Sequence, residues 1–319
     1  MMALFVVSRA MGLLREIVIA HQFGTSAELD AYLAAFRVPD LLFALMAGGA
    51  LGSAFIPVFS DYLTRGDEGD AWQLASAVIN WVLVFLSVAG VVAALVAPVL
   101  VDTVIAPGFT TAQKALTVEL MRWMLVATVI FGVSGVVMGI LNARQHFWRP
   151  ALAPSIYNAA IIAGAWLLGP SMGVYGLVVG VLIGAVGHLL IQIPGLRREG
   201  MRFSLRLAPG DPGVREVGWL MAPRALGLAA VEVNHLVNVM LASSLAVGSL
   251  AALNYGRLIM LLPEGVIAQS VAIAAFPTFA VLVARNQRGQ LGNMLQTTLR
   301  SVLYLTLPAA VGLIWLRQP

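Results

Sequence analysis

The sequence predicts an all-α, polytopic membrane protein: a bundle of transmembrane helices in two pseudo-symmetric lobes, the second incomplete. Of its 319 residues, 60% are hydrophobic and only 11% are charged, against about 25% charged in soluble domains. Apolar runs recur at close to the ~20 residues that span hydrocarbon, and one motif occurs twice. Because the runs are long and do not alternate, they indicate helices and exclude a closed barrel.

About nine candidate spans follow one another along the chain. Their centres lie near Gly12, Met46, Leu86, Ile130, Ile162, Val181, Val231, Val271 and Val311. The first run leads into two arginines and no small-residue cleavage site follows it, so we expect a retained helix and no cleaved signal peptide. The chain has no cysteine, which excludes disulfides and thiol chemistry.

Basic residues gather in every second connection between the spans. These connections hold Arg65, Arg144, Arg149, Arg197, Arg198, Arg202, Arg206, Arg215, Arg285 and Arg288. The alternate connections hold almost none beyond Lys114. The positive-inside rule therefore predicts that the N-terminus and the basic connections are cytoplasmic. The net charge of +4 is then a signal of topology, and we expect no nucleic-acid partner.

The longest polar connection, residues 197–216, has the Pro and Gly content of a linker. It predicts three regions: a six-helix transmembrane lobe at residues 1–192, a basic cytoplasmic linker at 193–215, and a partial second lobe of about three helices at 216–319.

An internal repeat relates the two lobes. SRAMGL at residues 8–13 recurs as PRALGL at 223–228, and an arginine precedes a proline by 20 residues at Arg37 and again at Arg257. Such repeats are typical of transporters that bind substrate between two lobes near the membrane midplane. Because the second copy stops after about three spans, we expect the chain to be part of a longer protein.

Charged residues inside apolar spans are the candidate binding residues. An arginine at the bilayer centre costs from about 2.5 to over 10 kcal/mol, so such residues normally face a bundle interior or a wet cavity. Arginines that converge on one cavity would bind an anion, and guanidinium groups match phosphate oxygens. The candidates for this site are Arg9, Arg15, Asp30, Arg37 and Arg257, with Glu16, Arg224, His235 and Asn238 as cavity lining.

Helical spacing separates the first-span charges. Arg9 and Glu16 are seven residues apart and share a face, whereas Arg15 points about 120° away. We therefore expect Glu16 to neutralise Arg9 in part, and Arg15 to contact an anionic substrate. The alternative is that the spacings form buried structural ion pairs, namely Arg9–Glu16, Asp30–Arg37 and Glu119–Arg122.

Other patterns in the sequence are weaker evidence for a function. Glu232 and His235 have the spacing of a bundle metal site, but no other span supplies a second such pair, so we expect no metal. The run GGALGSA, residues 48–54, favours close helix packing or a bend. The sequence has no nucleophile elbow and no phosphate-binding glycine loop. We therefore expect a transporter, with no enzymatic activity and no cofactor.

Several motifs resemble one family. SRAMGLLREIVIAHQFGTSAELDAYLAAFRVPDLL, GGALGSAFIPVFSDY, APGF and ILNARQHFWRPALAPSIYN are similar to the MurJ (MviN-type) lipid II flippases of bacterial peptidoglycan synthesis. These belong to the superfamily of multidrug, oligosaccharidyl-lipid and polysaccharide exporters. The resemblance implies two six-helix lobes and a further helix pair, of which this chain would hold about nine helices.

The resemblance also implies a location in the bacterial cytoplasmic membrane and a substrate, lipid II. Alternating access would move this undecaprenyl-pyrophosphate-linked precursor between leaflets, with coupling to a monovalent cation or the membrane potential. By motif, the pyrophosphate would be held by Arg9, Arg15, Asp30, Arg37 and Arg257. One departure is that Phe43, Ala44 and Gly48 stand where many members carry a basic pair and a glutamate.

Three alternatives remain open at this stage. A lipid-linked polysaccharide flippase would handle a similar pyrophosphate. A multidrug exporter of the same superfamily would favour a cavity dominated by acids. A truncated membrane scaffold would bind partners and transport nothing.

Overall fold

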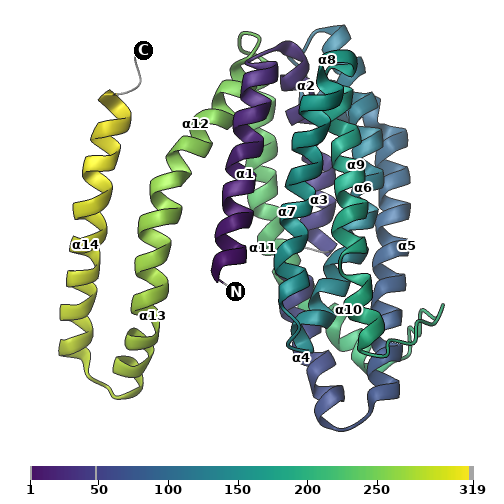
Figure 1. Ribbon diagram of the computed structural model, residues 1–319, viewed down its shortest axis with the longest axis vertical. Helices are drawn as coiled ribbons and strands as arrows, with labels where there is room; N and C mark the ends of the chain where they lie inside the picture. The colour runs from purple at the N-terminus through teal and green to yellow at the C-terminus, as the bar shows by residue number, and fades with distance from the viewer. Residues whose placement is uncertain (1, 47–48, 316–319) are drawn as a thin grey trace. The chain divides into compact units, whose positions relative to one another are not determined.

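The computed structural model describes residues 2–46 and 49–315 of the chain. Within these ranges the regular structure is helical throughout, as predicted (Figure 1). The chain forms two compact units, which divide between Ala251 and Ala252.

The helices of the first unit follow the predicted order. They are α1 (Met2–Phe23), α2 (Ala27–Ala35), α3 (Arg37–Met46), α4 (Gly49–Thr64), α5 (Glu68–Leu100), α6 (Thr111–Ala143), α7 (Trp148–Ala163), α8 (Gly169–Met172), α9 (Val174–Leu190), α10 (Ile193–Arg198) and α11 (Pro212–Ser243). Short π-helical segments, η1 (Val101–Ile105) and η2 (Gly164–Leu168), extend α5 and α7. Next comes α12 (Ser249–Pro263), which begins in the first unit and crosses the division between the units.

Seven of the expected spans are long and apolar enough to cross a membrane in the described part of the chain. They are residues 27–64, 68–105, 111–143, 148–172, 174–198, 212–243 and 288–315. The other two expected spans are helical as well. The first, α1, carries three charged residues, and α13 (Gln269–Ala284) is only 16 residues long. The chain is therefore a multi-pass membrane protein.

The span centred near Met46 is interrupted between α2 and α3, and residues 47–48 further along it lie outside the described residues. Phe36 separates α2 from α3, and Ser26 caps α2 by accepting a hydrogen bond from the Leu29 amide at 3.2 Å. Pro39 lies in the first turn of α3, where a missing N–H is tolerated. The predicted GGALGSA feature falls partly outside the described residues, because Gly48 lies there, and α4 begins at Gly49.

The core of the first unit lies between α4, α5 and α6, with contributions from α11. Phe55 stacks on Phe59 at a centroid distance of 5.2 Å, and Phe59 contacts Trp72 at 5.8 Å. Val217 of α11 is buried against the same cluster. The core thus joins the helix after the linker to the helices before it.

Glycines bring α7 and α9 close together. Gly176, Gly180 and Gly184 recur every four residues along one face of α9. A Cβ on Gly180 would lie 2.8 Å from the Ala160 carbonyl oxygen, and one on Gly164 would lie 2.4 Å from the Gly176 oxygen. Small residues at this spacing allow backbones of membrane helices to approach closely.

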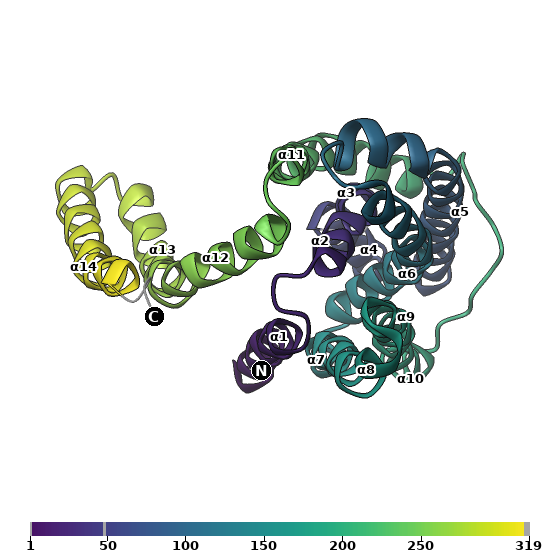
Figure 2. The same cartoon turned by 90° about the horizontal axis from the view of Figure 1, so that it is seen from above.

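The connection between α10 and α11 passes along the outside of α5 (Figure 2). Residues 201–208 of this connection form neither helix nor strand, and α11 then packs on α3 and α4. The predicted lobe boundary at residues 193–215 stays a prediction.

The second unit contains the rest of α12, a π-helical segment, η3 (Glu264–Ala268), and a helical hairpin. The hairpin consists of α13 and α14 (Arg288–Trp315), which pack against each other. In the described part of α14 no residue is buried.

Candidate functional site

Arg15 of α1 is held by two neighbouring side chains. Its Nη2 and Nε donate to Glu16 Oε1 at 2.6 and 3.2 Å, and its Nη1 donates to Asn158 Oδ1 of α7 at 3.0 Å. The side chains of Arg15 and Glu16 are 28% and 15% exposed. A guanidinium carries five N–H donors, so these bonds leave two for another partner.

This geometry corrects the expected division of the first-span charges. The partner of Glu16 is Arg15, not Arg9, and Arg9 is exposed on α1. The prediction used the angular spacing of a bare helix, in which residues one apart diverge by about 100°. Long side chains bridge that angle, and Asn158 holds the guanidinium on the Glu16 side.

Arg37 and Asp40 form a second charged pair at the start of α3. Arg37 Nη2 lies 3.6 Å from Asp40 Oδ2, and its Nε donates to the Leu33 carbonyl oxygen at 3.3 Å. Asp40 also interacts electrostatically with Arg15 and with Glu232 of α11. Charged groups from α1, α3 and α11 are therefore close enough to influence one another.

Asp30 was predicted to contribute to the binding site, and that role stays a prediction. It is 2% exposed, and its two carboxylate oxygens accept from the Gly248 and Ala251 amides at 2.7 and 2.8 Å. These amides open α12, whose unpaired N–H groups attract an acidic cap. The expected Asp30–Arg37 pair is thus wrong, because Asp30 caps a helix and Arg37 binds Asp40.

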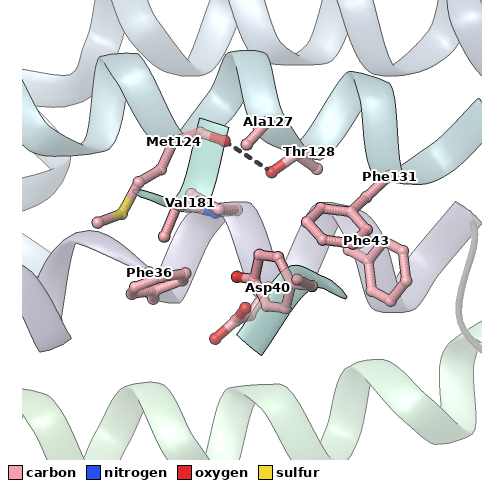
Figure 3. A pocket seen from close by; sticks show the side chains of 10 residues that line it. Phe36, Asp40, Phe43, Met124, Ala127, Thr128, Phe131 and Val181 are labelled. Atoms are coloured by element: carbon pink, nitrogen blue, oxygen red, sulfur yellow. Dashed lines mark hydrogen bonds between the residues drawn. The ribbon is translucent and has the colours of Figure 1, made fainter. Parts of the chain in front are cut away.

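A cavity of about 220 Å³ lies beside Asp40 (Figure 3). Its walls are mostly apolar and aromatic: Phe36, Pro39, Asp40, Phe43, Met124, Ala127, Thr128, Phe131, Tyr157 and Val181. Phe131 makes edge-to-face contacts with Phe43 at 6.0 Å and with Tyr157 at 4.7 Å. Tyr157 lines the cavity, and the next residue, Asn158, binds Arg15. Helix α7 therefore contributes a side chain to the cavity and another to the Arg15 cluster, which consists of Arg15, Glu16 and Asn158.

The predicted lining residues of α11 are only partly enclosed. Arg224 and Asn238 are exposed, and His235 is half-buried. Asn238 Nδ2 donates to Asn234 Oδ1 at 3.2 Å, one turn earlier on the same helix. The first unit does not bury this face of α11, and its role in a cavity stays a prediction.

Arg257 lies on α12 in the second unit. Its convergence with the arginines of the first unit also stays a prediction.

The structural pair expected between Glu119 and Arg122 is wrong as well. Glu119 accepts a hydrogen bond from the Tyr175 hydroxyl at 2.6 Å, and Arg122 Nε donates to the Ala94 carbonyl oxygen of α5 at 3.1 Å. Both side chains therefore join α6 to neighbouring helices. Across the described residues, no three His, Asp or Glu side chains gather as a metal site would require.

Sequence reasoning missed two contributors to the site. Asn158 ends the motif ILNARQHFWRPALAPSIYN, so a signal for it was present, but its partner on α1 could not be read from spacing. Phe43 was noted only as a departure from the family pattern. It lines the cavity, to which it contributes an aromatic ring.

Long apolar helices that carry paired charges beside a cavity define this chain as a polytopic membrane protein with charged side chains inside its helix bundle. Comparison with known proteins identifies the family to which the chain belongs. Residues 19–319 match the family described as "Lipid II flippase MurJ". The chain belongs to this family.

Two curated relatives illustrate the likeness. The chain is 30% identical to "Lipid II flippase MurJ" of Burkholderia cenocepacia, over 98% of this chain and 62% of that protein. It is 32% identical to "Probable lipid II flippase MurJ" of Rhizobium tropici, over 97% of this chain and 59% of that protein. The chain thus spans about three fifths of the length of these relatives.

Solved structures agree with the fold. A structure titled "Lipid II flippase MurJ, inward closed conformation" matches with a TM-score of 0.81 and 26% identity, over 99% of this chain and 66% of that one. An inward-facing multidrug resistance transporter of the MATE family matches with a TM-score of 0.75 at 17% identity, over 98% and 70%. The second likeness is one of fold alone.

Proposed function

We propose that this protein acts in the transport of lipid II, moving the undecaprenyl-pyrophosphate-linked precursor from the cytoplasmic to the outer leaflet by alternating access. Membership of the lipid II flippase family supports the proposal, as does the high share of apolar helix. The activity belongs to the whole protein, and the relatives that bear this name are longer than the chain.

The observation that carries the proposal is the Arg15 cluster. An arginine that is bound on one side by Glu16 and Asn158 is held in one orientation while two N–H donors remain for an anion. A pyrophosphate offers oxygens for such a fork. We assign Arg15 to phosphate contact. We propose that Arg9, Arg37 and Arg257 add positive charge to the substrate cavity of the whole protein, and that Arg224, His235 and Asn238 line it.

We assign Asp30 a different role, in closing the outer side of the cavity. Its carboxylate joins α2 to the first turn of α12 through two amide hydrogen bonds. In the orientation predicted from basic residues, this junction lies at the outer end of the helices. Opening toward the outside would break the cap, and its re-formation would favour closure.

The same proposal includes the orientation and the energy source. The N-terminus would be cytoplasmic, as the basic connections predict. Positive cavity residues make transport of an anionic headgroup sensitive to the membrane potential, because moving one charge through 100 mV involves about 2.3 kcal/mol. Coupling to a monovalent cation is the other form of the proposal, and an ionophore that collapses one gradient at a time distinguishes the two.

Depletion and rescue in bacteria test the function. Cells depleted of their own lipid II flippase would receive the gene in its natural reading frame through its own stop codon. We expect it to restore growth and normal shape, and Arg15→Ala to fail at equal membrane abundance.

The matched control is Arg122→Ala, which removes an arginine from an apolar helix outside the cluster. We expect this variant to rescue. Full rescue by Arg15→Ala would refute the role of Arg15, and failure of the unaltered gene would count against the flippase itself.

A further inference from the structure

The connection between α10 and α11, residues 200–211 (here called the linker), is held along α5 by side-chain hydrogen bonds. Asn80 Nδ2 donates to the carbonyl oxygens of Ser204 and Arg206 at 2.8 and 2.9 Å. Trp81 Nε1 donates to the Leu207 carbonyl oxygen at 2.8 Å. These side-chain hydrogen bonds hold the backbone of residues 204–207 against α5.

Both ends of this linker are also held. Glu199, just before it, pairs with Arg144 Nε at 3.6 Å and with His146 Nε2 at 2.5 Å. Asp211, at its end, caps α11 by accepting from the Gly213 and Val214 amides at 2.8 and 3.2 Å. The linker is therefore a fixed surface feature of the first unit.

The linker exposes both apolar and basic side chains. Phe203, Leu205 and Leu207 are 53%, 86% and 38% exposed. Arg202 and Arg206 are exposed too, and neither joins an ion pair in the part of the chain that the structure describes. The linker therefore presents apolar side chains next to basic ones.

A cavity of about 370 Å³ lies between this linker and the first turns of α5. It is lined by Gly69, Trp72, Gln73, Arg202, Phe203, Ser204 and Arg206. Two guanidinium groups and one side-chain amide thus border a space large enough for a phosphate-bearing headgroup. The acids nearest in sequence are Glu68, which binds Arg144 at 3.1 Å, and Asp70, and neither lines the cavity.

The surface of α5 beside the linker is apolar and exposed, as in a helix that contacts lipid. Immediately after Trp81, α5 exposes Leu83, Val84, Phe85 and Val88, which in a membrane span contact acyl chains. Tryptophan at such a boundary is typical of the interface between headgroups and hydrocarbon. The linker therefore lies at the level of the headgroups, and its exposed apolar side chains can reach the lipid tails.

We propose that this linker and the first turns of α5 form a binding site for the headgroup of an anionic phospholipid. Arg202 and Arg206 bind the phosphate, Phe203 borders the headgroup, and Leu205 contacts the acyl chains. The occupant is a membrane lipid and not a free anion, because a free anion would leave the exposed apolar side chains of the linker uncovered. The inference does not depend on the transport proposal or on which side of the membrane the linker faces.

Lipid titration tests the proposal. The full chain, purified in detergent, would be titrated with phosphatidylglycerol and, separately, with phosphatidylcholine of the same acyl chains, and bound lipids counted by native mass spectrometry. We expect selective binding of phosphatidylglycerol. The double variant Arg202→Gln and Arg206→Gln should weaken this binding by roughly 10- to 30-fold, since it removes two attractive interactions between an arginine and the anionic headgroup.

The matched control is Arg197→Gln with Arg198→Gln, which removes the same charge from the end of α10 outside the cavity. We expect it to bind lipid within about twofold of the unaltered chain, because the effect of an exposed charge is screened with distance. Equal loss in both double variants, or unchanged binding in the Arg202 and Arg206 variant, would overturn the site. Displacement of the lipid by equimolar inorganic phosphate would also overturn it, by assigning the cavity to a free anion.

Discussion

Arg15 and Glu16 are adjacent in sequence, and their pairing changes the charge of the site. Together they are neutral, so the exposed Arg9 is the cation on α1 that the described contacts leave most open. Arg15 contributes oriented donors more than net charge. Its role in substrate binding stays a prediction. Its bond to Asn158 could not be predicted from the sequence, because Asn158 lies on α7, 143 residues further along the chain.

Removing the carboxylate of this pair should be costly. We predict that Glu16→Ala lowers the stability of the protein by about 1–3 kcal/mol, because it leaves a partly buried guanidinium without its charged partner. The midpoint of thermal unfolding in detergent measures the effect. Glu28→Ala, which removes an exposed acid from α2, serves as the control, and an equal midpoint for Glu16→Ala would contradict the pairing.

The role of Asp30 as a helix cap makes a graded prediction. Asp30→Ala removes both acceptors for the Gly248 and Ala251 amides and should cost about 1–2 kcal/mol. Asp30→Asn keeps one acceptor and should cost less. Thermal unfolding of both variants checks the order, and a substrate role without capping would predict no loss of stability in either.

At the scale of elements, the positions of the spans were largely predicted correctly, whereas the interruptions within them were not predicted. Periodic apolar runs determine which segments enter the membrane, because length and hydropathy alone decide insertion. The break between α2 and α3 had a sequence signal in Pro39, which suits a first turn. The π-helical segments η1 and η2 had none that spacing could identify.

Helix contacts such as those of α7 and α9 depend on close approach. A side chain at Gly180 would collide with backbone atoms of Ala160 and Ile161, at 2.8 and 2.9 Å from a Cβ. We predict that Gly180→Leu prevents correct folding, because backbone atoms cannot move aside as a flexible side chain can.

Detergent extraction followed by size-exclusion chromatography measures this effect. The control is Gly218→Leu on α11, where a Cβ would meet no atom within 4 Å. We expect the control to elute as a single symmetric peak and Gly180→Leu to aggregate. A monodisperse Gly180→Leu protein would show that the two helices do not need this contact.

For the whole molecule, the orientation can be tested cleanly because the chain contains no cysteine. We predict that Ala246→Cys, in the exposed turn after α11, reacts with a membrane-impermeant maleimide in intact spheroplasts. Asp67→Cys, in the turn before α5, should react only after the membrane is permeabilised. The opposite labelling pattern would reverse the orientation.

The whole-molecule architecture was predictable where it rests on repetition. The SRAMGL and PRALGL repeat and the paired arginine–proline spacings indicated two related parts, and the all-α membrane fold was confirmed. Convergence of Arg257 with Arg9 and Arg37 stays a prediction, because it depends on how the two compact units meet. No spacing within one helix can determine that arrangement.

The leaflet distribution of lipid II tests the central claim most directly. In cells depleted of their own flippase and supplied with this gene, lipid II would be quantified before and after treatment of intact spheroplasts with an enzyme that cleaves only exposed precursor. We predict that the gene restores a large externally cleavable fraction and that Arg15→Ala does not, whereas Arg122→Ala does. A cleavable fraction no greater than in cells with empty vector, with the protein present in the membrane, would contradict the account.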